Sequence, residues 1–174
     1  MSESPGLEAT LAAYTRELAR WGQRMNLVGS TEPSAIARHL EDSLATVVDL
    51  GSGAGFPGFP IALARHDLSV VLVEIREKRL AFLRHVAREL APRVEVLESS
   101  IESDPPHAFD FALLRAVAKP KRSLEIAIPW VAPSGEIWIW AGPADDLPGA
   151  RPLALRSGGK ILRLRASDFS RGTT

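Results

Sequence analysis

Three glycines and two carboxylates have the types and spacing of a nucleoside-binding site. Gly51, Gly53 and Gly55 follow directly after Asp49, and Glu74 comes 25 residues after that aspartate. Glycines let a backbone turn tightly and approach a ligand closely. Asp49 could order such a turn or face an ammonium group, and a strand-end carboxylate such as Glu74 can accept both hydroxyls of a ribose. We interpret these residues as a site for a nucleoside cofactor.

The same stretch formally matches the dinucleotide-binding pattern G-x-G-x-x-G, from Gly53 to Gly58. That pattern should begin at the strand end, a place that Gly51 holds here. Pro57 also stands where the amides of a helix N-terminus would bind a pyrophosphate, and proline has no N–H to donate. A thioether nucleoside has no pyrophosphate and does not need those donors. We therefore favour S-adenosylmethionine over a dinucleotide as the cofactor.

Strands and helices alternate around these residues. Continuous apolar runs, typical of strands buried on both faces of a parallel sheet, predict strands at 46–50, 69–73, 94–97, 109–114 and 136–140. Apolar periodicity predicts helices at 61–65, 77–90 and around 123–128. Segments 152–156 and 160–165 flank a Ser-Gly-Gly turn and predict a β-hairpin. Because ligands bind at the carboxyl ends of such strands, Asp49 and Glu74 should lie at one edge of the sheet.

This order of elements predicts an α/β fold: a doubly wound, mostly parallel sheet with an antiparallel C-terminal hairpin, as in Rossmann-like methyltransferases. We expect a single domain over residues 1–174, with an N-terminal helical cap at 1–45 and an α/β core at 46–174. The first cap helix is predicted from six apolar positions on one face, and a shorter helix follows. The six positions are Leu7, Leu11, Tyr14, Leu18, Trp21 and Met25, and the shorter helix runs through Ile36, Leu40 and Leu44.

The composition narrows the function classes. The chain has no cysteine, which excludes a disulfide framework, a cysteine-ligated zinc site and a thiol nucleophile. No histidine pair has a zinc-like spacing beside a carboxylate, so we expect no metal. No apolar run approaches the ~20 residues that span a bilayer, and a signal-peptide pattern is absent, so we expect no membrane partner. The absence of cysteine fits a protein of the reducing cytoplasm. We expect a monomer.

The net charge of zero is unevenly distributed. Residues 1–114 carry 11 basic and 16 acidic side chains, whereas residues 115–174 carry 10 basic and 5 acidic ones. Such an asymmetry suggests a surface that faces a polyanion in the second half. Lys119, Lys121 and Arg122 are candidates for contacts with RNA phosphates. The alternative, a solvated loop without a partner, stays open.

Five blocks of the sequence carry a resemblance to a known family. They are residues 26–28, 38–44, 49–60, 78–83 and 115–118. The run Gly-Ala-Gly-Phe-Pro-Gly-Phe-Pro and the Arg-His-Leu-Glu-Asp-Ser-Leu block before it are the most specific. In these blocks the chain resembles the bacterial methyltransferases that modify N7 of a guanine in small-subunit (16S) ribosomal RNA, also called glucose-inhibited division protein B.

The resemblance implies an S-adenosylmethionine-dependent enzyme whose partner is ribosomal RNA or the small ribosomal subunit. It places cofactor contacts at Gly51, Phe56, Ile101, Glu102 and Arg115, and makes Arg115, at the end of the fourth strand, the candidate catalytic residue. The chain departs from the family in having Ala141 where a lysine is usual. Two alternatives remain: a methyltransferase of small molecules or proteins, and a non-catalytic member that binds cofactor or RNA.

Overall fold

The computed structural model describes residues 12–13, 16–17, 20 and 45–169. The five described N-terminal residues are helical. The apolar positions of the predicted first helix, and the whole predicted second helix, lie outside the described residues. Residues 1–44 form one compact unit and residues 45–174 another, and the second unit contains the α/β fold.

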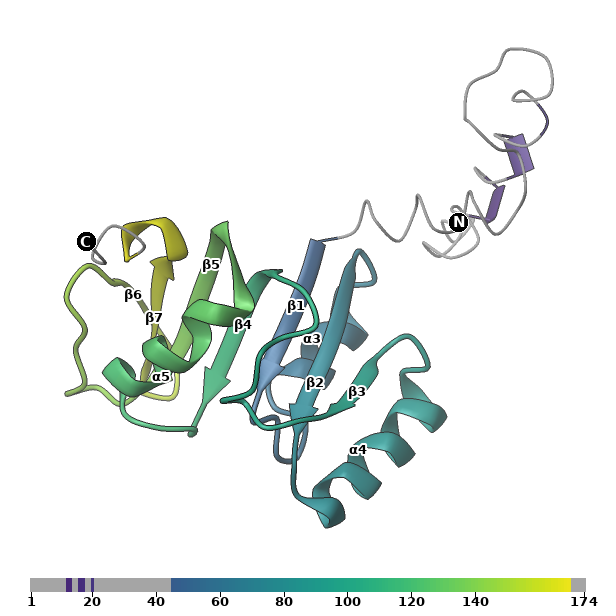
Figure 1. The fold of residues 1–174 in the computed structure, drawn as a ribbon, viewed down its shortest axis with the longest axis horizontal. Coiled ribbons are helices and arrows are strands. Elements are labelled where there is room, and N and C mark those ends of the chain that lie inside the picture. The colour runs from purple at the N-terminus through teal and green to yellow at the C-terminus, as the bar shows by residue number, and fades with distance from the viewer. Residues whose placement is uncertain (1–11, 14–15, 18–19, 21–44, 170–174) are drawn as a thin grey trace. The chain divides into compact units, whose positions relative to one another are not determined.

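Seven strands in the described part of the chain form one sheet. They are β1 (Ala45–Leu50), β2 (Leu68–Glu74), β3 (Glu95–Glu98), β4 (Phe109–Arg115), β5 (Val131–Ala141), β6 (Arg151–Ala154) and β7 (Lys160–Arg165). Their order across the sheet is β3-β2-β1-β4-β5-β7-β6 (Figure 1). The first five are parallel to one another, and β7 runs antiparallel to both β5 and β6. The predicted doubly wound sheet with an antiparallel hairpin is confirmed.

Helices cover both faces of this sheet (Figure 1). On one face α3 (Gly58–Ala64) and α4 (Glu77–Leu90) contribute Phe59 and Leu83 to a buried cluster with Leu72 and Leu113. On the other face α5 (Pro120–Ala127) and a 3₁₀ turn at 128–130 bury Trp130, which stacks on Phe109 with ring centroids 6.3 Å apart. A second 3₁₀ turn follows β7 at 166–168. The two clusters leave the carboxyl ends of the parallel strands free to carry a site.

Several element boundaries differ from the predictions by one to three residues, and the start of β5 differs by five. β5 begins at Val131 rather than Glu136, because Val131 pairs with Phe109 before an irregularity that restores the register at Glu136 and Phe111. The polar residues of that stretch resemble a loop in the sequence. α3 begins at Gly58 rather than Ile61. The predicted helix 77–90 is confirmed with its bounds.

Candidate functional site

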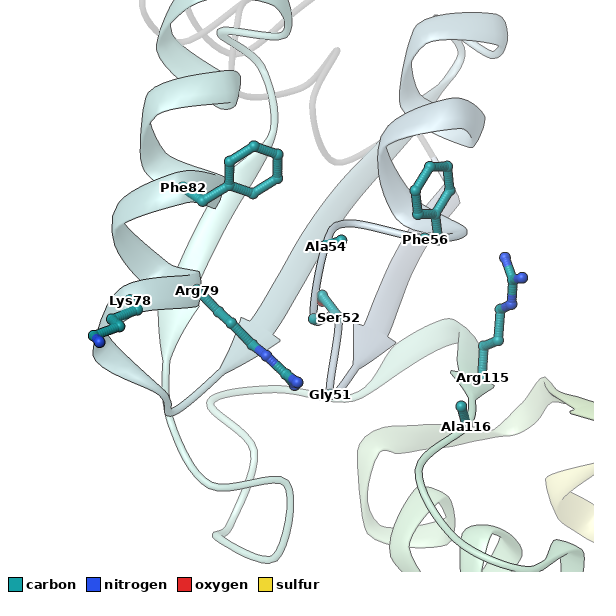
Figure 2. Close-up of a pocket in the computed structure, with 10 residues that line it drawn as sticks. Gly51, Ser52, Ala54, Phe56, Lys78, Arg79, Phe82, Arg115 and Ala116 are labelled. Carbon is teal, nitrogen blue, oxygen red and sulfur yellow. The ribbon is translucent and has the colours of Figure 1, made fainter.

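A pocket of about 470 Å³ lies where β1 and β4 end, within the size range of small-molecule sites. In Figure 2 the loop after β1 occupies its centre, with side chains of α4 on one side and Arg115 on the other. Four predicted site residues line it: Gly51, Gly53, Phe56 and Arg115. The remaining lining residues are Ser52, Ala54, Lys78, Arg79, Phe82 and Ala116.

The loop depends on glycine in two different ways. Gly51, Gly53 and Gly55 have φ of +71°, +60° and +86°, a conformation that favours glycine. A Cβ at Gly55 would lie 2.2 Å from the Phe59 ring, so this glycine lets α3 pack closely against the loop. A Cβ at Gly53 would meet nothing nearer than Arg79 at 3.7 Å. A side chain at Gly53 would be in ordinary contact with Arg79 and the Gly51 carbonyl, and Gly53 itself lines the pocket.

Asp49 is a buried residue that holds the glycine loop after β1 in place through hydrogen bonds. It is 1 % exposed, and its Oδ2 accepts a 2.9 Å hydrogen bond from the Gly58 backbone N–H. Ser52 Oγ donates to the Asp49 carbonyl at 2.7 Å. Burial raises the pKa of Asp49 to about 7, against the lowering effects of the Gly58 hydrogen bond and the Arg115 charge. Of the two predicted roles of Asp49, these contacts support the ordering of the turn, and the carboxylate is not part of the pocket lining.

Glu74 closes β2 as a buried carboxylate with four hydrogen-bond donors. Oε1 accepts the backbone N–H groups of Ile75 and Arg76 at 2.9 and 3.0 Å. Oε2 accepts the Gly53 backbone N–H at 3.1 Å and Arg79 Nη1 at 3.5 Å. Burial alone would raise the pKa of this carboxyl, but the four donors outweigh it and hold the pKa below its ordinary value. Glu74 is therefore an ionised group tied directly to the glycine loop.

Arg79 is the only one of these four donors that is a side chain. Its contact with Glu74 is the longest of the four, and its side chain is 47 % exposed. The three backbone donors cannot leave without unfolding the loop, whereas an exposed arginine changes rotamer at little cost. Arg79 is therefore the most easily displaced of the four donors.

Arg115 and Phe56 form the wall opposite α4 (Figure 2). The Arg115 guanidinium lies 5.9 Å from the centroid of the Phe56 ring, within the range of a cation–π contact. Phe56 is 54 % exposed, so its ring offers apolar surface to the pocket that it lines. Ala116, the next residue, has a φ of +55°, so the chain turns sharply as it leaves β4 and leaves Arg115 at the pocket rim.

The other predicted residues lie outside the pocket lining. Ile101 packs against the core under α5, and its carbonyl accepts the Trp130 indole N–H at 3.0 Å. Glu102 is exposed and pairs with Arg122 at 2.5 Å. Arg122 also contacts Glu125 at 3.2 Å. Lys119 and Lys121 are exposed at the start of α5.

Sequence reasoning missed the three pocket residues of α4, although they lie within the block 78–83, and it missed Ala116 beside Arg115. Lys78, Arg79 and Phe82 line the pocket from the first turns of α4. The buried stripe of this helix contains Leu80 and Leu83, so its neighbours at 78, 79 and 82 lie toward the flank of the helix. The start of a helix that follows a parallel strand lies at the ligand edge of the sheet. Those two signals together could have identified the three residues.

Among the residues that the structure describes, no group of three or more His, Cys, Asp or Glu side chains could hold a metal ion. No helix in the described ranges is long and apolar enough to cross a membrane.

Solved structures with the same fold include methyltransferases. An RNA methyltransferase from Salinibacter ruber, in complex with S-adenosyl-L-homocysteine, aligns with a TM-score of 0.56 at 21 % identity, over 80 % of this chain and 94 % of that one. The S-adenosylmethionine-dependent methyltransferase SibL aligns with a TM-score of 0.59 at 17 % identity, over 95 % of this chain and 63 % of that one. At these identities the likeness establishes the fold.

Comparison of the sequence with known families and proteins identifies relatives of this chain. The family model of rRNA small subunit methyltransferase G matches residues 7–146. The protein of that name from Roseiflexus sp. (strain RS-1) is 37 % identical over 87 % of this chain and 73 % of its own length. That from Paramagnetospirillum magneticum is 36 % identical over 93 % and 89 %. The chain therefore belongs to the rRNA small subunit methyltransferase G family.

Proposed function

We propose that the chain transfers a methyl group from S-adenosylmethionine to N7 of a guanine in small-subunit (16S) ribosomal RNA. The observation that carries the proposal is the pocket after β1, whose lining residue Gly53 donates its backbone N–H to the ionised carboxylate of Glu74. A family that methylates ribosomal RNA needs a nucleoside cofactor at the carboxyl ends of the central strands.

The pocket residues fit this cofactor. Glu74 is not itself a lining residue, but it binds the lining residues Gly53 and Arg79. It would accept the ribose hydroxyls in place of Arg79, and Phe56 and Phe82 offer apolar surface for the rest of the molecule. Lys78 and Arg79 bring positive charge to the α4 side, which suits the carboxylate of a methionine moiety. When bound, S-adenosylmethionine supplies an electrophilic methyl group on a sulfonium.

The reaction depends mainly on the alignment of guanine N7 with the methyl group and needs little acid–base catalysis. Guanine N7 carries a free lone pair, so no general base is needed, and orientation of two reactants can lower a barrier by roughly 7–11 kcal/mol. The guanine gains positive charge as N7 is methylated, so a cation at N7 itself would oppose the reaction. We therefore assign Arg115 to the neighbouring O6, an acceptor on the same edge of guanine, where it would orient the base.

We place the contacts with RNA phosphates at the rim of the pocket. Lys119 and Lys121 follow Arg115 by a few residues and are exposed, so they can meet phosphates next to the target nucleotide. Arg122 contributes less, because Glu102 and Glu125 neutralise it. The target guanine would be splayed out of folded RNA, since N7 must reach the cofactor. This substrate implies a cytoplasmic site of action, and we propose a monomeric enzyme.

Transfer of a labelled methyl group tests the proposal. Purified protein is incubated with labelled S-adenosylmethionine and either small ribosomal subunits or naked small-subunit RNA that lacks the modification. We expect label in 7-methylguanosine after digestion of the RNA, and none with a Gly53→Val variant. Label in protein or a small molecule would instead favour another substrate. Cofactor binding without transfer to any substrate would favour a non-catalytic member.

A further inference from the structure

The antiparallel edge of the sheet concentrates positive charge. Residues 151–165 contain five basic and no acidic side chains. The strand register places Arg163 opposite both Trp138 and Arg151, and Arg165 opposite Glu136. Residues that oppose each other on neighbouring strands point to the same face of a sheet. Arg151, Arg163 and Arg165, which we call the edge arginine cluster, therefore lie together on one face.

Most of this charge lacks a counter-ion. Arg165 Nε lies 4.0 Å from Glu136, a long contact, whose carboxylate also accepts the Trp138 indole N–H at 2.9 Å. Within the described ranges, Arg151 and Arg163 form no ion pair with an acidic side chain. The cluster and Glu136 together leave an excess of two positive charges.

Arg163 is held in place and has an unused donor. Its guanidinium lies 6.0 Å from the centroid of the Trp138 ring. Its Nε is buried and has no hydrogen-bond partner. The buried Nε is not accessible to an incoming anion, which would meet the outer nitrogens of the guanidinium instead. A guanidinium whose ring contact already fixes its orientation loses little entropy on binding.

A small hollow between these arginines indicates which kind of ligand can bind there. A hollow of about 40 Å³ is lined by the edge arginine cluster, Glu136 and Leu164. A hollow of this size, lined by three arginines, can receive the oxygens of one anionic group. Arginine favours phosphate because its planar donors match the oxygens.

The cluster lies on the same face of the sheet as the rim of the pocket. Arg115 is in register with Trp140, which is in register with Ile161. Arg163 is two residues further along β7 than Ile161. Two strand spacings of ~4.8 Å and two residues with a rise of ~3.4 Å each place its Cα about 12 Å from that of Arg115. RNA with a nucleotide at Arg115 can reach the cluster within a few nucleotides.

We propose that the edge arginine cluster binds a backbone phosphate of the RNA substrate near the target guanine. The inference rests on the proposed function and adds a contact on the hairpin, which the sequence motifs do not include. It also explains the positive balance of residues 115–174, since half of their ten basic residues lie in 151–165.

Filter binding of small-subunit ribosomal RNA over a salt series tests the cluster. The variant Arg151→Gln/Arg165→Gln removes two exposed charges and leaves the half-buried Arg163 in place. A matched control, Arg84→Gln/Arg88→Gln, removes two exposed arginines of α4 that pair with Glu98 and Glu89. A third variant, Arg163→Lys, keeps the charge but loses the planar donors. Cofactor titration and thermal melting accompany each variant.

We expect the double variant to weaken RNA binding about 10-fold or more at 0.1 M salt. The slope of log K against log salt should fall by roughly 0.7–0.9, the contribution of one lost phosphate contact. The α4 control should match the wild type, and cofactor affinity should be unchanged in all variants. Arg163→Lys should weaken RNA binding with little change in slope.

A double variant with wild-type RNA affinity and slope overturns the cluster while leaving the proposed function intact. An equal loss in the α4 control also overturns it, because the effect would then be one of net charge alone. A wild-type protein that neither binds nor methylates the RNA contradicts the proposed function itself, and with it the cluster. Binding of the cluster to anionic vesicles but not to RNA would assign it to a membrane surface and overturn the inference.

Discussion

The Asp49 carboxylate accepts a 2.9 Å hydrogen bond from the Gly58 backbone N–H, which fixes the first residue of α3 to the end of β1. Only glycine permits this approach. A Cβ at Gly58 would lie 2.2 Å from Leu72 Cδ2 and 2.8 Å from Asp49 Oδ2. The contact therefore links the buried carboxylate, the packing of α3 and the shape of the glycine loop.

Asp49→Asn should change how stability depends on pH. The carboxyl pKa rises from its ordinary value of 3.8 to about 7 in the folded chain. Between these values the folded state keeps a proton that the unfolded state releases, so the free energy of unfolding falls as pH rises from about 4 to 7. At ~1.36 kcal/mol per unit, the loss is on the order of 4 kcal/mol. Asparagine keeps an acceptor for Gly58 without a charge, so urea unfolding should show a flatter profile in that window.

Asp67→Asn provides the matched control. Asp67 is a surface aspartate whose pKa is lowered to about 2, first by its hydrogen bond with Arg65. A lowered pKa contributes stability that is present above 3.8 and lost as pH falls through about 2, which lies outside the window from 4 to 7. Its profile in that window should follow the wild type. Parallel profiles for wild type and Asp49→Asn would contradict the burial argument.

Glu74→Gln should weaken S-adenosylmethionine binding by about 1–3 kcal/mol, the scale of hydrogen bonds to a charged group. The amide keeps one acceptor but loses the charge and one oxygen. Glu98→Gln is the control, because Glu98 is the register partner of Glu74 on β3, is exposed and pairs with Arg84. Calorimetry on both variants measures the difference. Equal affinities for both would remove Glu74 from the ribose site.

Gly53→Val should lose cofactor binding for a reason that a control can isolate. Gly53 has a φ of +60°, and valine pays a backbone penalty of ~1–3 kcal/mol in this region. Gly158→Val carries the same kind of penalty, since Gly158 has a φ of +88° in the hairpin with open space around its Cβ. Both should melt at lower temperatures, but only Gly53→Val should fail to bind S-adenosylmethionine. Normal binding by a folded Gly53→Val protein would place the cofactor elsewhere.

Local patterns were enough to predict the strands and the helix 77–90, because apolar runs and periodicity decide burial in a parallel sheet. They also placed Gly53 and Glu74 together, since both follow strand ends. The partners of Asp49 and Glu102 could not be predicted in this way. The Glu102–Arg122 pair joins residues 20 positions apart on a loop and a helix, and the Asp49–Gly58 bond depends on how α3 packs. Such contacts follow from the tertiary structure and have no signature in residue spacing.

Lys119→Gln/Lys121→Gln should reduce RNA affinity and its salt dependence, whereas Arg122→Gln should have a smaller effect. The two lysines are exposed cations beyond Arg115, and Arg122 is neutralised by Glu102 and Glu125. Each lost phosphate contact should lower the slope of log K against log salt by ~0.7–0.9. Filter binding compares the variants. A larger effect of Arg122→Gln than of both lysines together would show that its ion pairs open in the complex.

Arg115→Gln should damage turnover more than binding. The guanidinium lies at the pocket rim over Phe56, at the end of the strand that follows the loop at 99–108. If it orients the guanine through O6, its loss removes alignment, and a small misplacement of reacting atoms costs on the order of 100-fold in rate. Single-turnover methyl transfer at saturating RNA should fall by about that factor, while filter binding changes by less than about 10-fold, the effect of roughly one phosphate contact.

The control is Arg76→Gln, which removes an exposed arginine outside the pocket lining. Because the Arg76 backbone N–H, and not its side chain, binds Glu74, this control should keep the wild-type rate. An Arg115→Gln enzyme with normal turnover would leave alignment of the guanine to other groups, and Arg115 would then serve the RNA backbone alone.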